Sequence, residues 1–351
     1  MSGARLGSSL PARQRAVALG PVTLRIDARA ALVSGALVLL VLAVLVASLL
    51  AGEYRIGVPE LIDTLRGAPP ERLAHFFVLE RRLPRALVAL VVGAALATSG
   101  AIFQALTRNP LASPDVLGIS SGASAGAVIV LLALSGSIAQ ATVGAVIGAC
   151  AAALLLAALG ARGGLQGARL VLLGVALAAV GSSVVSYLLS QVFVASATVA
   201  QTWLVGSLQG RGWADLVPAL VGLAVVAAVV APQARGLALL AHGDEAAAGL
   251  GVPVRALRPA LLAAATVLVA LAVATAGPIS FVALVAPHLA RRMAGSDALV
   301  PAALTGALLL ALSDLIAQYA FPVPVPVGVL TVTLGGVFFV ALLWREGRVR
   351  G

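Results

Sequence analysis

Ten apolar runs, separated by short polar or charged segments, make up most of this 351-residue chain. A helix needs about 20 apolar residues to cross a hydrocarbon core of about 30 Å, and most of the runs have that length. Backbone polar groups find no partners in lipid, so each run is predicted to be a helix. The runs lie at 31–51, 86–106, 116–134, 141–160, 168–190, 214–232, 258–276, 279–290, 299–319 and 327–344. The eighth run is short, and 191–213 is ambiguous between a loop and a short non-spanning helix around Trp203.

The composition agrees with this pattern. Hydrophobic residues make up 61% of the chain, charged residues only 10%, and the mean hydropathy is +1.10. Soluble domains are nearer half apolar and a quarter charged. The expected fold is therefore an all-α polytopic membrane protein with about ten transmembrane helices. We expect a basic cytoplasmic tail at 1–29, a single transmembrane domain at 30–345 and a cytoplasmic tail at 346–351. The run 31–51 is longer than a signal-peptide core and is interpreted as an uncleaved first helix.

The arginines predict an orientation. All 23 basic residues are Arg, and they lie between the runs instead of forming one basic face, which argues against nucleic-acid binding. With a cytoplasmic N-terminus, sixteen arginines lie inside and seven outside, which favours cytoplasmic N- and C-termini and an even number of helices. All outside arginines except Arg211 lie in 52–85, a segment whose acidic residues bring its own charge close to zero.

Residues able to support catalysis or metal binding are scarce. The lone Cys150 lies inside an apolar run, and the three histidines are widely separated, so neither a disulfide framework nor a metal site is predicted. A Walker A motif needs a Lys to reach the nucleotide phosphates, and the chain contains no Lys. The chain is therefore not expected to have an ATPase site of its own, and no catalytic residue is predicted.

Three glycines four residues apart, Gly118, Gly122 and Gly126, are predicted to share one helix face, where small residues let membrane helices approach closely. The same stretch matches the G-x-S-x-G pattern twice, with Ser120 and Ser124 as the serines. A nucleophile elbow would need a strand–turn–helix context with His and acid partners, and none is evident. An intramembrane enzyme is thus an alternative, and helix packing is the preferred interpretation.

Six strings in this chain are long or distinctive enough to compare with known families. They are Arg81-Arg-Leu-Pro-Arg85, Thr107-Arg-Asn-Pro-Leu-Ala-Ser-Pro-Asp-Val-Leu-Gly118, Trp203–Leu208, Gly243–Val252, Gly277–Arg291 and Pro326–Thr331. Together they resemble the permease family of ABC importers for ferric siderophores, haem and cobalamin. The resemblance spans roughly 31–345 and implies the type II ABC importer permease architecture in the bacterial cytoplasmic (inner) membrane.

The resemblance also implies two sites at opposite membrane faces. Asn109 and Leu111 match positions that line the cytoplasmic gate, although a residue before Pro also tends to end a helix. Arg82 and Arg85 match positions that receive acidic residues of the extracytoplasmic binding protein, although arginines here could also serve as interfacial anchors. The family often has a further Arg in the ninth helix where this chain has Gln318.

A third implied site is the loop that couples the permease to its ATPase. The positions that match the family's coupling helix are Gly243, Asp244, Glu245, Gly249, Leu250 and Gly251. An ordinary solvated loop is the alternative. The acid within an apolar run, Asp314, could belong to a proton relay. Because no His or Lys partner is in view, a role in helix packing and hydrogen bonding, which the resemblance also implies, is preferred.

The partners implied by the resemblance are two cytoplasmic ABC ATPase subunits, which use ATP and Mg, a periplasmic or lipoprotein binding protein, and a second permease chain, identical or paralogous. The chain itself is expected to bind no cofactor directly, and its surroundings are the lipid bilayer. The string from Thr107 to Gly118 favours a ferric siderophore as cargo, with cobalamin and haem as alternatives. An ion-coupled secondary transporter would need more buried acids or broken helices and is less favoured.

Overall fold

The computed structural model describes residues 14–19, 22–68, 71–161 and 167–350. Two antiparallel strands, β1 (Gln14–Leu19) and β2 (Val22–Asp27), pair with each other ahead of the first helix. This hairpin lies in the stretch predicted as an N-terminal tail, so the all-helical class predicted for the transmembrane domain is confirmed. The remaining elements of the described chain are helical.

The helices follow one another with short connections. Their bounds are α1 (Ala28–Leu50), α2 (Val58–Leu65), α3 (Arg72–His75), η1 (Phe76–Arg82), α4 (Leu83–Thr107), α5 (Ile119–Val128), η2 (Ile129–Ala133), α6 (Ile138–Ala161), α7 (Gly167–Ser190), α8 (Val194–Leu204), α9 (Trp213–Val230), η3 (Ala231–Gln233), α10 (Ala234–Leu240), α11 (Asp244–Gly249), α12 (Val254–Ala276), α13 (Val282–Ala294), α14 (Leu299–Tyr319) and α15 (Val327–Arg350). The elements η1 and η2 are π-helical turns, and η3 is a short 3-10 helix.

Each of the ten apolar runs contains a helix. Among the described residues, seven helices are long and apolar enough to cross a membrane, by length and composition. These are Ala28–Leu50, Arg72–Thr107, Ile138–Leu159, Arg169–Ser190, Trp213–Leu240, Val254–Ala276 and Leu299–Tyr319. The third and tenth runs give shorter apolar helices, and the eighth gives α13, which has 13 residues. A count of ten crossing helices therefore stays a prediction.

The second helix begins earlier than its apolar run. The run starts at residue 86, whereas helical structure is continuous over 36 residues from Arg72 to Thr107. Several charged residues lie in the first turns of this span and lower its hydropathy, although the backbone there is already helical. Helix α2 also lies within 52–85. The segment is thus mostly helical, and its arginines at 81, 82 and 85 are on a helix instead of in a loop.

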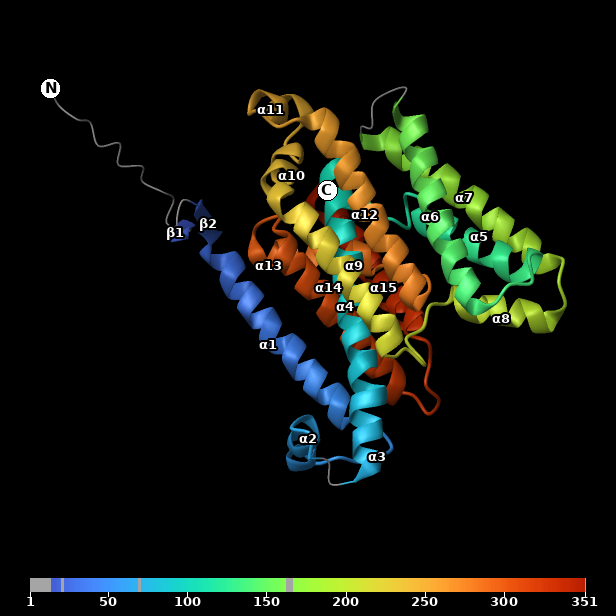
Figure 1. Cartoon of the computed structure of the whole chain (residues 1–351). Helices are drawn as coiled ribbons and strands as arrows, with labels where there is room; N and C mark the ends of the chain where they lie inside the picture. The colour runs from blue at the N-terminus through green and yellow to red at the C-terminus, as the bar shows by residue number, and fades with distance from the viewer. Residues whose placement is uncertain (1–13, 20–21, 69–70, 162–166, 351) are drawn as a thin grey trace.

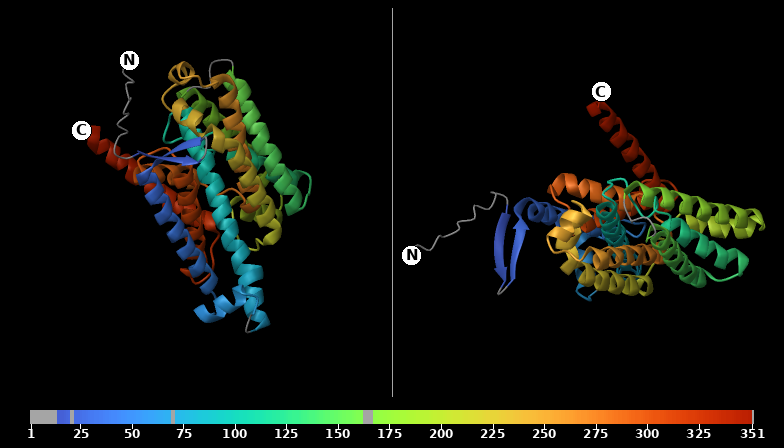
Figure 2. Two further views of the ribbon diagram at one scale, coloured as in Figure 1. Left: turned by 60° about the vertical axis from the view of Figure 1, so that its left-hand side comes forward. Right: turned by 90° about the horizontal axis from the view of Figure 1, so that it is seen from above.

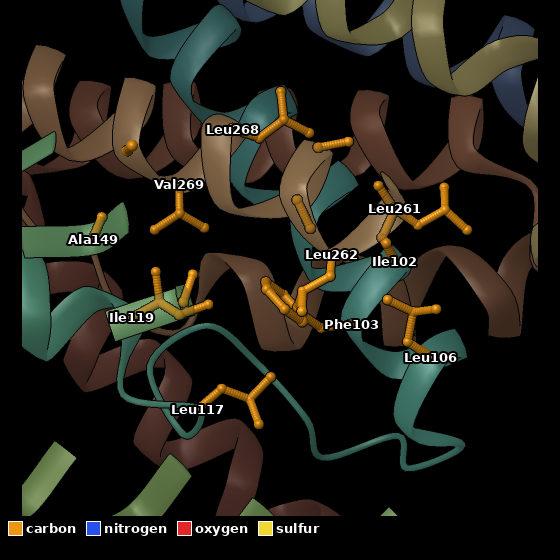
Figure 3. Close-up of a cluster of buried hydrophobic side chains, with 14 of the residues drawn as sticks. Ile102, Phe103, Leu106, Leu117, Ile119, Ala149, Leu261, Leu262, Leu268 and Val269 are labelled. Carbon is orange, nitrogen blue, oxygen red and sulfur yellow. The ribbon is translucent and has the colours of Figure 1, made fainter. Parts of the chain in front are cut away.

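Helix α4 forms the centre of the bundle. It packs against α9, α12, α13 and α14, and Figure 1 shows it running through the middle of the helices. Figure 3 shows Ile102 and Phe103 of α4 packed with Leu261 and Leu262 of α12. This burial of apolar side chains against several neighbours makes α4 the core helix of the bundle.

Glycines bring α5 close to α6. A Cβ at Gly126 would collide with the carbonyl oxygen of Gly144, and one at Gly122 would lie 2.8 Å from that of Gly148. Gly118, in contrast, is not on the helix face that the spacing predicts. It is the left-handed N-cap of α5, with φ of 75°, and packs against α7. The four-residue period cannot reveal that the helix starts only at Ile119.

The last helix leaves the bundle. Figure 2 shows α15 projecting away from the other helices, and Val337, Val340 and Trp344 on it are largely exposed. The helix continues to Arg350, through most of the stretch predicted as a C-terminal tail. Within 191–213 the structure contains the short helix α8, which ends one residue after Trp203, so the short-helix alternative is confirmed.

Candidate functional site

Polar and charged residues gather at two opposite ends of the bundle. Figure 1 shows α2 and α3 at one end and α11 at the other. The first end carries a cavity rich in arginine, which we call the basic cavity. The second end carries the predicted coupling and gate residues.

The basic cavity has a volume of about 280 Å³ and is formed by five parts of the chain. Its lining is Ser48 from α1, Arg81 and Arg82 from η1, Arg85 and Ala86 from α4, Gly210 and Arg211 from the loop before α9, and Asp314, Gln318 and Tyr319 from α14. Four guanidinium groups face one carboxylate in this lining. The cavity is therefore suited to receive a group with negative charge.

Arg85 and Asp314 form a largely buried ion pair. The Arg85 Nε donates to Asp314 Oδ2 at 3.1 Å, and Nη2 donates to Oδ1 at 2.8 Å. Only 17% of the Arg85 side chain and 6% of the Asp314 side chain are exposed. The Gln318 Nε2 adds a hydrogen bond of 2.6 Å to Asp314 Oδ2. The partner of Asp314 is thus an Arg 229 residues away in the sequence, instead of a His or Lys.

Arg82 connects the end of α1 to η1. Its Nη1 donates to the Leu49 carbonyl at 2.7 Å, and its Nη2 donates to the Tyr54 carbonyl at 2.6 Å. Its guanidinium lies 6.0 Å from the centroid of the Phe77 ring. Among the described residues, no ion pair joins Arg82 to a carboxylate. Its charge is thus held by neutral dipoles and stays available to an incoming anion.

Near this end, Tyr54 donates from its hydroxyl to Glu71 at 3.0 Å. This hydrogen bond, with smaller effects of burial and of the Glu71 and Glu60 charges, raises the pKa of Tyr54 above its usual value. The hydroxyl therefore stays protonated and holds the segment before α2 to the segment before α3.

Arg211 is a member of the cavity that the sequence did not single out. Its Nη1 lies 3.3 Å from Asp215 Oδ1, and Asp215 also accepts the Gly212 N–H at 2.9 Å at the start of α9. The Nε of Arg211 is buried and has no hydrogen-bond partner among the described residues. The one sequence signal that could have pointed to Arg211 is that it is the single Arg between 191 and 213.

At the other end, α4 stops at Thr107 and the predicted gate residues follow. Arg108 caps the helix in the left-handed conformation, with φ of 52°. The Asn109 Oδ1 accepts the Leu111 N–H at 2.9 Å, which forms an Asx turn with Pro110 as its middle residue. The structure therefore locates Asn109 and Leu111 in a tight turn directly after the central helix.

The predicted coupling residues form a short exposed helix and its flanks. Gly243 precedes α11 with φ of 123°, Asp244 and Glu245 occupy the first turn, and Gly249 ends it. Leu250 is 69% exposed, and Gly251 follows with φ of 83°. Nothing lies within 4 Å of a Cβ at residues 249 or 251. An exposed helix with an apolar tip suits contact with another protein.

The structure brings the predicted coupling residues, 243–251, next to the turn that holds the predicted gate residues Asn109 and Leu111. The Arg258 side chain, from α12, bonds to Asp244 and to the Leu106 carbonyl at the end of α4. A Cβ at Gly243 would lie 3.6 Å from the Arg108 Nη1. The sequence did not single out Arg258, because its partners lie 14 and 152 residues away.

A second polar cavity lies where α5 and α7 meet the loop after α12. Its volume is about 310 Å³, and its polar lining consists of Asp115, Ser120, Ser121, Ser124, Ser182, Ser186 and Ser280. The Asp115 Oδ2 accepts the Phe281 N–H at 3.2 Å. Ser120 and Ser124 lie on a helix, without the strand of a nucleophile elbow, and no His lines this cavity. The geometry does not favour the intramembrane-enzyme alternative.

Metal binding finds no support in the part of the chain that the structure describes, where no group of three or more His, Cys, Asp or Glu residues could hold an ion. His288 lies inside α13, with its ring 5.6 Å from that of Phe338.

Residues 39–345 match the FecCD transport family. The chain belongs to this family. It is 40% identical over 301 residues to the ferric enterobactin permease FepG of Escherichia coli, a match that covers 85% of this chain and 91% of FepG. It is 38% identical over 325 residues to the vitamin B12 permease BtuC of E. coli, covering 89% of this chain and 94% of BtuC. The Bacillus subtilis Fe(3+)-citrate permease YfmE is 37% identical over 321 residues, covering 89% of this chain and 94% of YfmE.

Solved structures show the same fold. A metal-chelate-type ABC transporter in an inward-facing conformation matches with a TM-score of 0.80 and 28% identity, covering 90% of this chain and 99% of that chain. PsaBC of Streptococcus pneumoniae matches with a TM-score of 0.52 at 16% identity, covering 81% of this chain and 95% of that one, which shows the fold alone. Together with the apolar helices, these matches identify a multi-pass membrane protein.

Proposed function

We propose that this protein is the membrane-spanning permease subunit of an ABC importer and that it carries an iron–siderophore complex across the bacterial inner membrane. The observation that carries the proposal is the match to the FecCD transport family over residues 39–345. Relatives with names that specify ferric enterobactin, achromobactin or ferric citrate support an iron chelate as cargo.

We infer a topology of ten crossings with both termini in the cytoplasm. The arginine distribution supports it, and so does the position of the basic cavity and α11 at opposite ends of the bundle. The remaining helices, α5 with η2, α13 and α15, would complete the ten crossings inside the bundle or against a second chain, where a helix need not meet lipid along its whole length.

At the outer end, the basic cavity would receive acidic side chains of a substrate-binding protein. No carboxylate among the described residues pairs with Arg82, so it is the first candidate, and charge complementarity would mainly orient and accelerate docking. Arg85 is already paired with Asp314, so we assign it a shared role in docking and in holding α4 to α14. Arg211 supplies a further guanidinium beside Gln318, the position at which the family often has an Arg.

At the inner end, α11 would fit against one of two cytoplasmic ATPase subunits, which bind and hydrolyse ATP with Mg. The exposed apolar faces of α7 and α15 would meet a second permease chain or lipid. Because the permease would work by alternating its gates, the turn at Asn109 and Leu111 would open and close the cytoplasmic side of the path.

Uptake in cells that lack their own permeases tests the function. The chain, its partner ATPase and its binding protein would be expressed together, and accumulation of iron-55 ferric siderophore and of radiolabelled cobalamin would be compared. We expect ferric siderophore to accumulate, and a hydrolysis-deficient ATPase to abolish the accumulation. Accumulation of cobalamin instead would change the cargo, and uptake that persists without ATP hydrolysis would support an ion-coupled transporter.

The docking role is tested with Arg82→Gln and Arg211→Gln in nanodisc-embedded complexes. Each substitution removes a positive charge from the cavity and should lower the association rate with the binding protein by roughly tenfold at low salt, with less effect at high salt. Arg66→Gln, an exposed Arg at the end of α2 outside the cavity, is the control. Unchanged association rates in both cavity variants would contradict the assignment.

A further inference from the structure

We propose that Arg258 transmits movement between the ATPase-facing helix α11 and the cytoplasmic gate turn. This inference rests on the proposed function, because it assigns to Arg258 a part in the coupling of ATP hydrolysis to transport. It is carried by the contacts of one side chain that joins three elements far apart in the sequence.

The first contact is with α11. Arg258 Nη2 and Nε both donate to Asp244 Oδ1, at 2.9 and 3.3 Å. Asp244 is the first residue of α11, and most of the rest of this short helix is exposed, with Ala247 as its one buried residue. A helix with so little burial is positioned by few contacts. The ion pair is therefore a major constraint on where the start of α11 lies.

The second contact is with the end of α4. Arg258 Nη2 also donates to the Leu106 carbonyl at 3.0 Å. The last four carbonyls of a helix lack partners within the helix, and the C-terminal end carries partial negative charge. A guanidinium satisfies both needs at once. The gate residues Asn109 and Leu111 lie three and five residues beyond this carbonyl, so a shift of Arg258 acts directly on the turn that holds them.

Burial makes the connection stiff. The Arg258 side chain is only 9% exposed, and breaking a buried charged contact costs far more than breaking a contact on the surface. Separation from Asp244 would leave a guanidinium that is mostly buried without its carboxylate, so we expect Arg258 to follow Asp244 or to pull it back when α11 moves. A displacement of α11 would thus reach the end of α4 through two hydrogen-bonded contacts of one rigid planar group.

A reconstituted complex with its ATPases and binding protein tests this role. In Arg258→Gln we expect the ATPase to remain bound and its basal rate to stay within about twofold, while cargo transported per ATP hydrolysed falls at least tenfold. Asp244→Asn should also lower the cargo transported per ATP. The double variant should lower it little more than the worse single variant does, because both substitutions remove the same contact. Arg258→Lys should recover transport in part, since one ammonium reaches Asp244 without the planar fork.

Arg255→Gln is the matched control, since Arg255 is an exposed residue one turn earlier on α12. A normal transport-to-ATP ratio in Arg258→Gln would overturn the inference. If Arg258→Gln fails to assemble, Asp244→Asn decides, because it weakens the ion pair and leaves the Leu106 contact; a normal ratio there would equally overturn it. Lack of ATP-dependent uptake by the unaltered complex would instead refute the proposed function.

A spectroscopic readout separates coupling from simple structural support. Spin labels at Ala248, on the exposed face of α11, and at Leu111, in the gate turn, would report both ends in a chain without Cys150. With the Arg258–Asp244 contact intact, ATP should change the distances measured from the labels at both sites. In Arg258→Gln we expect the change at Ala248 to remain and the change at Leu111 to be lost. Equal responses at both sites in the variant would contradict the role.

Discussion

The Arg85–Asp314 pair allows a quantitative test of what holds α4 and α14, two helices far apart in the sequence, together. The perturbation is Asp314→Leu, which removes the carboxylate and leaves the guanidinium among α4, α14 and the basic cavity. Arg85 loses bonds of 3.1 and 2.8 Å in a site where its side chain is only 17% exposed. Breaking a buried pair by removing one partner costs about 3–5 kcal/mol. Because Arg85 also faces the cavity and can be rehydrated there, we expect the lower end, about 3 kcal/mol.

Arg85→Leu leaves Asp314, which is only 6% exposed, with the Gln318 hydrogen bond at 2.6 Å. We expect the free energy of unfolding to fall by about 4 kcal/mol, since Asp314 is the more buried partner. Apolar pairs often replace buried ion pairs at little cost, so the double variant should lose only about 1 kcal/mol. The implied coupling energy is about 6 kcal/mol, within the range measured for close charge pairs.

Equilibrium unfolding by sodium dodecyl sulfate in mixed micelles measures these free energies. Leu312→Ala, at an exposed position on the same helix, is the control and should cost under about 1 kcal/mol. The reasoning would be refuted if Asp314→Leu changed the free energy of unfolding by less than about 0.5 kcal/mol, or if the two single losses simply added in the double variant.

Two further predictions concern packing and topology. Gly126→Ala should force α5 away from α6 and destabilise the protein by about 1–3 kcal/mol, while Gly336→Ala, which meets nothing within 4 Å, should not; equal melting temperatures in detergent would contradict the packing argument. In a chain without Cys150, Ala68→Cys should react with a membrane-impermeant maleimide on intact spheroplasts, and Ala248→Cys only after permeabilisation. The reverse labelling pattern would invert the proposed topology.

The positions of the helices followed from the sequence to a large degree. Apolar residues at 299–319 coincide with α14, because lipid leaves a long apolar segment no alternative to helix. The strings that resemble the family also coincide with a tight turn after α4 and with the short exposed helix α11, whose gate and coupling roles stay proposals. Local patterns failed where the polarity of a segment does not match its backbone structure. The helix that begins at Arg72 is charged in its first turns, and Gly118 precedes its helix instead of lying on it.

Pairings between distant residues were decided by the tertiary structure alone. Hydropathy and motif spacing describe what each residue can do, but Arg85 becomes the partner of Asp314 only because α4 and α14 pack side by side. The same holds for Arg258, which reaches α11 and the end of α4 because α12 lies against both. A charged side chain in a low-dielectric bundle needs a partner, and the sequence alone implies this need. Which residue becomes the partner depends on how the helices assemble.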